Sequence, residues 1–218
     1  LQVAVAVGGD GTSEWNTNGN SLINPTLTNP TLDTSGFTNT SIVSNVDGIF
    51  REGFGVLTAG GDVSYVSGES LNISHRYELS ASGYTLKVTT TVTNLGASAV
   101  TNPRVWVGVN DDLLDAVATS DKSRGDVLNK DFVANATATD TVSAVKLSST
   151  DAHPMELLLL STSPKAKAYI QAGVGANFGD LVVTNPLDPA GVTSVIAGDN
   201  GYAIYARLSD LAPATSDS

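Results

Sequence analysis

Residues 73–94 read ISHRYELSASGYTLKVTTTVTN, and this stretch decides the fold class. Apolar or aromatic side chains recur at every second position on both sides of a short turn, Ala81-Ser82-Gly83. Such alternation places them on one face of a β-strand, whereas a helix would need a spacing of three or four. A glycine-containing turn between two such segments is typical of a β-hairpin. The alternating residues are Ile73, His75, Tyr77 and Leu79 before the turn and Tyr84, Leu86, Val88, Thr90 and Val92 after it.

Strand-like segments continue along the rest of the chain. From residue 41 onward there are about a dozen of them, separated by turns that contain Gly, Asn or Ser. Only 15% of the residues are charged, well below the roughly 25% of an average globular protein. These features predict an all-β fold, an antiparallel β-sandwich of the Ig-like or jelly-roll type. Residues 111–118 (DDLLDAVA) alone suggest a helical turn, and residues 120–131 (SDKSRGDVLNKD) suggest an exposed polar loop.

The first 35 residues differ in composition from the rest. The chain opens with LQVAVAV at positions 1–7, an apolar run that ends at a glycine-rich stretch. The residues that follow are dense in Asn, Thr, Pro and Gly, and Pro25 and Pro30 block a helix and favour extended backbone. We therefore predict a strand and an extended arm over residues 1–35 and a β-sandwich domain over residues 36–218. An ordinary long loop is the alternative for the arm.

Charge and cysteine content restrict the function classes. The chain has 22 acidic and 11 basic residues and a net charge of −11. A surface of that sign repels phosphate backbones, so no nucleic-acid partner is expected. Cysteine is absent, which excludes disulfides and thiolate chemistry. No run reaches the ~20 apolar residues of a membrane-spanning helix. The first residue is Leu rather than Met, which favours a processed chain in the extracellular space or on the cell surface.

Two oxygen-rich clusters are candidate calcium ligands. Ca²⁺ prefers several oxygen ligands from Asp and Asn side chains and from backbone carbonyls in loops. An acidic, solvated turn is the alternative for both clusters. The first comprises Asp10, Asn16, Asn18 and Asn20, and the second comprises Asp111, Asp112 and Asp115. Acceptor patterns for N-glycosylation also occur, with Asn39 and Asn135 as the candidate sites.

No constellation of residues predicts catalysis, so we expect no enzymatic activity. The chain has only two histidines, and His75 is placed by the alternation as a sheet-face or core residue with one hydrogen bond, while His153 lies in a turn-like DAHPME setting. The few glutamates form no recognisable acid–base pair. Arg124-Gly125-Asp126 matches an integrin-recognition tripeptide and falls in the predicted polar loop.

Residues 77–109, YELSASGYTLKVTTTVTNLGASAVTNPRVWVGV, resemble the strand–TVTNxG–strand passage of bacterial and archaeal surface proteins with Ig-like sandwich modules. Residues 208–218, LSDLAPATSDS, are similar to the LAPGxS turn that precedes the final core strand of such modules. The resemblance implies a cell-surface location and an architectural role. A further resemblance, to the galactose-mutarotase-like supersandwich, implies sugar chemistry. The histidine of that family is missing here, where the chain reads Val109-Asn110-Asp111-Asp112.

These observations favour a secreted structural protein, a subunit of an extracellular filament or surface layer. Similar modules continue beyond the LAPATSDS passage with one more core strand, so the sandwich is expected to leave an apolar groove open. The N-terminal strand of a neighbouring subunit could fill that groove by β-strand addition, and the product would be an open homopolymer. Pairing of the strand within its own chain is the alternative. The strand residues that would make the contact are Leu1, Val3, Val5 and Val7.

A second hypothesis is a module that binds surface glycans or mediates adhesion. Surface aromatic side chains would carry such a function, and Trp15 and Trp106 are the candidates. A carbohydrate-active enzyme of the supersandwich type is a third and weaker hypothesis.

Overall fold

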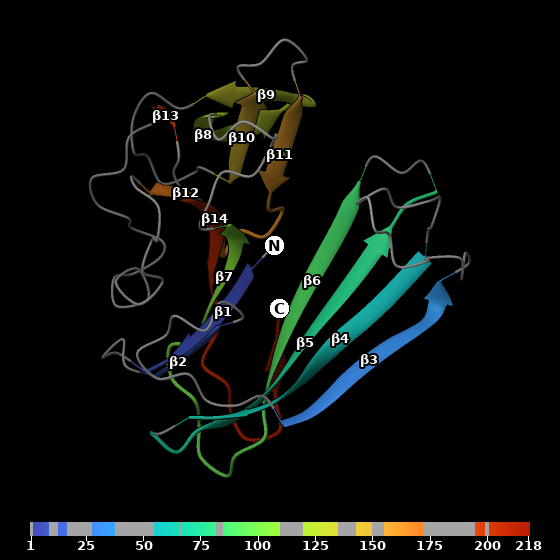
Figure 1. Ribbon diagram of the computed structural model, residues 1–218. Helices are drawn as coiled ribbons and strands as arrows, with labels where there is room; N and C mark the ends of the chain where they lie inside the picture. The colour runs from blue at the N-terminus through green and yellow to red at the C-terminus, as the bar shows by residue number, and fades with distance from the viewer. Residues whose placement is uncertain are drawn as a thin grey trace. The chain divides into compact units, whose positions relative to one another are not determined.

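The computed structural model is all-β, as the alternation predicts, and its sheets are antiparallel. Fifteen strands, β1 to β15, lie in the described part of the chain, which contains no helix and therefore no membrane-spanning helix. Figure 1 shows their arrangement within each sheet. The structure describes residues 2–8, 13–16, 28–37, 55–65, 67–81, 85–109, 120–134, 143–149, 155–171, 195–198 and 201–218.

The chain divides into two compact units, each assembled from separate stretches of sequence. Unit 1 comprises residues 1–24 and 101–210, and unit 2 comprises residues 25–100 and 211–218. These boundaries differ from the predicted 1–35 and 36–218. The reason is strand pairing between distant parts of the chain, because β1 and β2 join a sheet whose other three members follow residue 100.

Unit 1 contains two antiparallel sheets. The first has the strand order β12–β14–β7–β1–β2, and the second has the order β11–β10–β8–β13, with β9 also paired to β8. The strands of the first sheet are β1 (Gln2–Val7), β2 (Ser13–Asn16), β7 (Arg104–Val109), β12 (Ala166–Gln171) and β14 (Gly201–Arg207). Those of the second are β8 (Ser120–Leu128), β9 (Asp131–Ala134), β10 (Ala144–Ser149), β11 (Glu156–Leu160) and β13 (Val195–Ala197).

The core of unit 1 lies between these two sheets. Val145 and Leu147 of β10 pack with buried residues of β12 and β14, which belong to the other sheet. Two sheets that share one apolar layer form a β-sandwich, so the predicted fold class is confirmed in this unit. The buried residues contributed by β12 and β14 are Ala166, Ala168, Ile170, Tyr202 and Ile204.

Strand β8 corrects the prediction of an exposed loop over residues 120–131. Its core-facing positions are polar: Ser120, Lys122 and Arg124 alternate along the strand and are all buried. The Lys122 Nζ is fully enclosed and donates hydrogen bonds to oxygens of Ser120 and, at 2.7 Å, to the Gly198 carbonyl. Apolar alternation cannot reveal a strand whose buried positions are Ser, Lys and Arg.

Unit 2 is built on one five-stranded sheet with the order β15–β6–β5–β4–β3. The predicted hairpin is present as its centre, with β5 and β6 paired from Leu71↔Asn94 to Leu79↔Leu86. Figure 1 shows the long strands β3 to β6 side by side. The strands are β3 (Thr28–Phe37), β4 (Gly55–Ser64), β5 (Ser70–Leu79), β6 (Leu86–Asn94) and β15 (Ser216–Asp217). Of the predicted arm, residues 2–8, 13–16 and 28–35 are therefore described, almost all in strands, and the remainder lies outside the described residues.

The apolar face of this sheet follows the predicted alternation. Leu71, Ile73 and Val92 are fully buried, and His75 lies beside them in the same row of positions. Towards the far end of the hairpin the same face opens to solvent, and the Leu86 side chain there is half exposed. One end of the sheet therefore carries the core of unit 2.

Asn94, the asparagine of the TVTN segment, organises the buried end of the hairpin. Its side chain is completely buried, and its Nδ2 donates to the carbonyls of Ser98 and Leu211 at 2.8 and 2.9 Å. Its Oδ1 accepts from the Gly96 N–H, which closes the following turn. The asparagine thus ties that turn to the C-terminal segment that leads into β15.

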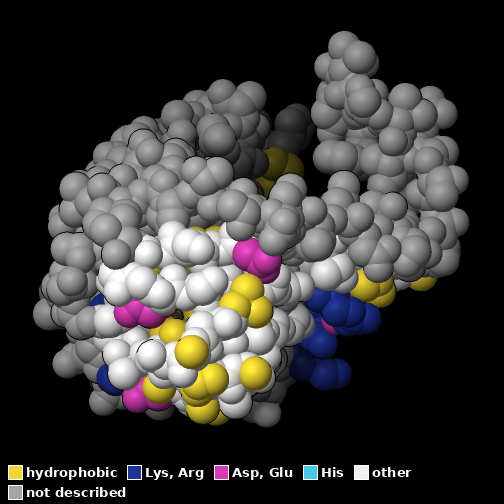
Figure 2. Space-filling view, turned by 90° about the horizontal axis from the view of Figure 1, so that it is seen from below, with side chains coloured by type: hydrophobic (Ala, Val, Ile, Leu, Met, Phe, Trp, Pro, Cys, Tyr) yellow, Lys and Arg dark blue, Asp and Glu magenta, His cyan; other side chains and the backbone are white. Residues whose placement is uncertain are grey.

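On the face shown in Figure 2, the described surface is mainly uncharged and polar. In Figure 2 such atoms alternate with scattered hydrophobic side chains, and Lys and Arg side chains gather along one side of the view. This agrees with the low charged fraction of the sequence.

Candidate assembly strand

Strand β1 lies inside the first sheet of unit 1, between β7 and β2 (Figure 1). It pairs within its own chain, with Val3 opposite Val107 and Val5 opposite Val105 on one side. On its other side Val5 lies opposite Trp15 of β2. The structure therefore has the intramolecular form of pairing, and β1 and β2 form a two-stranded hairpin that is added to the edge of β7.

The alternation of Val and Ala in β1 matches the two faces of the sheet. Val5 and Val7 share the face on which Val105 is buried, and Ala6 lies on the opposite face, where Trp106 and Arg104 are buried. All three β1 side chains are completely shielded from solvent. Small alanines on the Trp106 side and larger valines on the other side fit this difference in neighbouring volume.

The hydrogen-bond pattern shows how β1 is held to β7. The Leu208 N–H donates to the Pro103 carbonyl, so in the β7–β14 ladder Val105 and Val107 direct their backbone groups towards β14. The intervening residues of β7 then direct theirs towards β1. Val5 and Val105 consequently form a non-hydrogen-bonded pair, in which Cα atoms approach to about 4.5 Å.

A polar clamp fixes the end of β1. The Gly8 N–H donates to the Thr101 carbonyl at 3.0 Å, and the Gly8 carbonyl accepts from Asn102 Nδ2 at 2.8 Å and from Arg104 Nη2 at 2.9 Å. The Asn102 N–H is in turn held by Asp210 Oδ1 at 2.8 Å. We call Gly8, Thr101, Asn102, Arg104 and Asp210 the β1 clamp.

Backbone conformation explains two residues of the clamp. Gly8 and Asn102 have φ angles of 72° and 51°, in the left-handed region. Glycine adopts this region without steric penalty, and asparagine is the side-chain-bearing residue that tolerates it best. The chain can therefore turn sharply after β1 at Gly8 and before β7 at Asn102, and these two turns lie next to each other.

The apolar run in the sequence indicates strand β1, but no sequence pattern indicates the β1 clamp. Val5 and Val7 are buried in the β1 contact, whereas for Val3 only the backbone pairing is described. Leu1 lies outside the described residues. The glycine after the apolar run and the asparagine before Pro103 were the available signals, and neither indicates which partner it faces.

The candidate calcium ligands and glycosylation sites fall mostly outside the described residues. Asn16 is described only by its backbone, which pairs with Ala4. Within the described ranges no group of three or more Asp, Glu or His side chains is placed to hold a metal ion. The candidates outside the described residues are Asp10, Asn18, Asn20, Asp111, Asp112, Asp115, Asn39 and Asn135.

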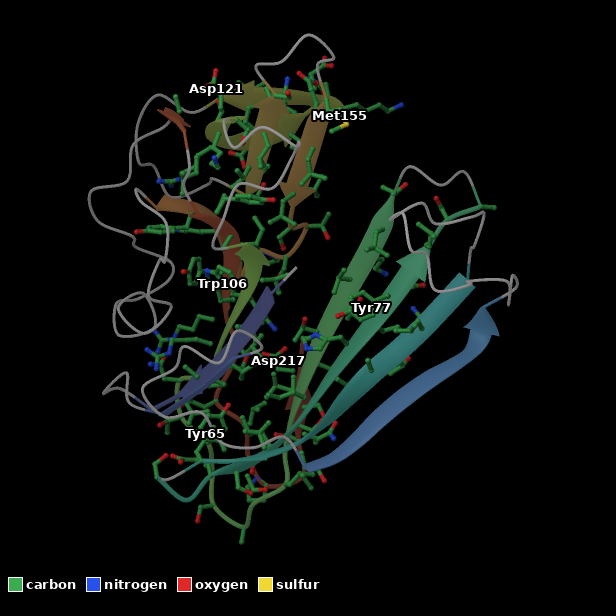
Figure 3. All side chains as sticks on the ribbon, in the orientation of Figure 1. Tyr65, Tyr77, Trp106, Asp121, Met155 and Asp217 are labelled. Atoms are coloured by element: carbon green, nitrogen blue, oxygen red, sulfur yellow. The ribbon has the colours of Figure 1, made fainter. Side chains whose placement is uncertain are left out.

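Two other predictions of exposed residues were wrong. Trp106, labelled on β7 in Figure 3, is buried and makes an edge-to-face contact with Tyr205. It therefore cannot offer a surface platform to a glycan. Arg124 is buried, and Asp126 Oδ1 accepts hydrogen bonds from the N–H and the hydroxyl of Ser143. The Arg124-Gly125-Asp126 tripeptide is therefore part of strand β8 and not of an exposed loop.

His75 has the predicted core role. Its Nδ1 lies 3.0 Å from Thr90 Oγ1 on the neighbouring strand, and burial lowers the pKa of its imidazole to about 4. A histidine with this pKa is neutral at physiological pH.

No protein-family model, curated protein or solved structure matches this chain.

Proposed function

We propose that this chain is a structural subunit of an extracellular filament or surface layer, and that subunits are joined by exchange of the β1–β2 hairpin. The observation that carries the proposal is the position of this hairpin: it occupies a sheet of unit 1 but is followed in sequence by unit 2. The chain returns to unit 1 only at Thr101.

This connectivity makes the hairpin exchangeable. The ladder to β7, the buried valines and the β1 clamp all form equally well whether the hairpin comes from the same chain or from another copy. Val5 and Val7 contribute about 1.5–3 kcal/mol each through burial, so either form is strongly favoured over an empty β7 edge. Whether the hairpin pairs within its own chain or with another copy then depends on the connection between Asn16 and Thr28.

Exchange of this kind gives a polymer. Each copy donates a hairpin at one surface and accepts one at another, which is a heterologous contact and leads to an open chain of subunits unless the ring closes. The acceptor is a sheet edge, and addition of a strand to such an edge is an established mode of protein association. A secreted structural role also agrees with the low charged fraction of the sequence, 15%.

The alternative role, glycan binding or adhesion, has less support. One of its two candidate aromatic residues, Trp106, is inside unit 1.

A disulfide lock tests the proposal. The chain has no cysteine, and the Val5–Val105 pair has the Cα separation that a disulfide needs. We expect the double variant Val5→Cys/Val105→Cys, oxidised at high dilution, to form no filaments in negative-stain images when it is concentrated. After reduction it should form the filaments that wild-type protein forms in negative-stain images. Filaments of equal length from the locked protein would contradict exchange of the hairpin.

A further inference from the structure

Strand β11 carries an apolar surface that the hairpin contact does not use. It reads ELLLL, from Glu156 to Leu160, and follows Met155, which Figure 3 labels. The side chains of Met155, Leu157, Leu158 and Leu160 are 40–47% exposed. Leu159 alone packs partly against the core of unit 1. Four leucines in a row with three of them exposed is unusual for a soluble protein and marks an interaction surface.

This strand is also an unprotected sheet edge. It pairs with β10 on one side, and no other described strand pairs with its outer side. Four other strands carry features that discourage further pairing. Strand β3 contains Pro30 and two register shifts, β12 contains Lys167, and β13 and β15 are only three and two residues long.

The hydrogen-bond register shows which backbone groups β11 presents at this edge. The Ser149 N–H donates to the Met155 carbonyl and the Ser161 N–H donates to the Ser143 carbonyl. In an antiparallel ladder the hydrogen-bonded pairs recur at every second residue. Leu157 and Leu159 therefore complete the ladder with β10. The remaining residues of the strand, Glu156, Leu158 and Leu160, direct their N–H and C=O groups outwards.

These outward groups are self-complementary. We propose that β11 pairs with β11 of a second copy of this chain, antiparallel and about a two-fold axis at Leu158. In this register Leu158 faces Leu158 of the other copy, and Glu156 faces Leu160. All three outward residues of each strand then belong to hydrogen-bonded pairs, and the two five-stranded sheets join into one.

The side chains agree with this register. Leu157 and Leu159 of one copy would face Leu159 and Leu157 of the other and would extend the apolar layer that contains Leu147. Non-hydrogen-bonded pairs bring side chains closest together, so the leucines pack directly.

Local charge also favours a second copy as the partner. The whole chain carries a net charge of −11, which opposes self-association. The only charge on β11 is Glu156, and it forms an ion pair with Lys146 of the adjacent strand at 2.5 Å. In the two-fold register each Glu156 faces a leucine, so no like charges oppose each other.

Single-cysteine variants test both the contact and its register. Leu158 and Leu160 lie on the same face of β11 and have nearly equal exposure, 40% and 42%. Leu158 lies on the proposed axis, whereas the two Leu160 residues would be separated by about 13 Å along the strands. Upon mild oxidation of the full chain we expect Leu158→Cys to form a disulfide-linked dimer and Leu160→Cys, the matched control, to form at least tenfold less. Equal yields from the two variants would overturn the register, and the absence of dimer from both would overturn the contact.

A proline substitution provides a second test in solution. The Leu158 N–H is not part of the ladder to β10, so Leu158→Pro removes an intermolecular donor and leaves every β10–β11 hydrogen bond in place. In the oxidised Val5→Cys/Val105→Cys background, where hairpin exchange is blocked, we expect the protein to shift towards twice its mass of 22.3 kDa with rising concentration in sedimentation velocity. Adding Leu158→Pro in this background should abolish the shift and leave the circular dichroism spectrum unchanged. Leu158→Thr, which keeps the N–H, should retain it. If the locked protein stays monomeric while the amides of Glu156, Leu158 and Leu160 resist hydrogen exchange, another part of the same chain covers the edge and the proposal is wrong.

This contact is independent of hairpin exchange. It would persist in the Val5→Cys/Val105→Cys protein locked by oxidation in the monomeric hairpin arrangement, and it would be absent from Leu158→Pro filaments. Failure of one proposal therefore leaves the other open to its own test.

Discussion

Protonation of His75 should destabilise unit 2 in mild acid. The imidazole is buried, and desolvation of its charged form lowers its pKa from 6.5 to about 4. A folded-state pKa below the unfolded value means that the unfolded chain binds more protons between these two pH values. The stability due to the neutral imidazole is therefore complete above pH 6.5, is lost as the pH falls towards 4, and changes no further below that.

The magnitude follows from the size of the shift. The fall from 6.5 to about 4, at about 1.4 kcal/mol for each pKa unit, corresponds to a loss of about 3.5 kcal/mol across this range. Because His75 faces Ala59 and Thr90 on the adjacent strands, the loss should appear in the sheet of unit 2. The variant His75→Gln keeps a hydrogen-bonding group near Thr90 but cannot titrate.

Two measurements check this reasoning. NMR titration of the imidazole should place the His75 pKa far below that of an exposed histidine. Hydrogen exchange of the Ile73 and Val92 amides, measured at several pH values and corrected for intrinsic rates, should report more acid destabilisation in wild-type protein than in His75→Gln. Titration of His75 near pH 6.5, or equal acid destabilisation of the two proteins, would refute the reasoning.

Three substitutions test other structural claims. Asn102→Ala should lower the free energy of unfolding of unit 1 by roughly 1–2 kcal/mol, and Asn102→Gly should lower it by less. Both variants lose the hydrogen bond to Gly8, but only alanine is also strained by the left-handed backbone at this position. Urea unfolding followed by tryptophan fluorescence measures both. Gly108→Ala should destabilise the same unit by roughly 1–3 kcal/mol in that assay, because a Cβ would lie 2.2 Å from a backbone oxygen of β14. Ala214→Gly should stabilise unit 2 by roughly 1 kcal/mol in hydrogen exchange, since Ala214 has a φ of 59° after Pro213. An effect of opposite sign in any of the three would contradict the backbone geometry described here.

The fold class was predictable because two kinds of strand have a recognisable sequence pattern. The β5–β6 hairpin has one apolar and one polar face, so period-two alternation revealed it. Strand β1 is apolar from Val3 to Val7, and its described side chains, Val5, Ala6 and Val7, are buried on both faces. Strand β8 could not be found in this way, because buried Lys122 and Arg124 look like surface residues in the sequence. Strands β8 and β9 form a hairpin that turns at Asn129 and Lys130, both of which have a positive φ. The polar sequence of this turn is equally compatible with a loop.

The division into units and the candidate contacts were harder to predict. The pairing of β1 with β7 joins residues about a hundred positions apart, and no local pattern encodes it. The β1 clamp likewise depends on Asn102 and Asp210 meeting the end of a distant strand. The apolar character of β11 was evident in the sequence, but its place at a sheet edge was not. Ala214 has a positive φ, a conformation that the alanine in the sequence did not indicate and that glycine adopts more readily.

The two proposed contacts would have different consequences for assembly. Hairpin exchange is head-to-tail and extends a chain of subunits, whereas pairing of β11 is two-fold and joins copies in pairs. A subunit with both contacts could connect filaments laterally, which is the arrangement expected of a surface layer.

The central claim is that the β1–β2 hairpin passes from one subunit to the next, and mixing two single-cysteine chains tests it most directly. A Val5→Cys chain and a Val105→Cys chain cannot form this disulfide within either molecule. If the hairpin is exchanged, oxidation of the mixture under assembly conditions should give a disulfide-linked dimer that neither chain forms alone. If the mixture gives no such dimer while the double variant forms its internal disulfide in full, the hairpin stays in its own chain and the claim is wrong.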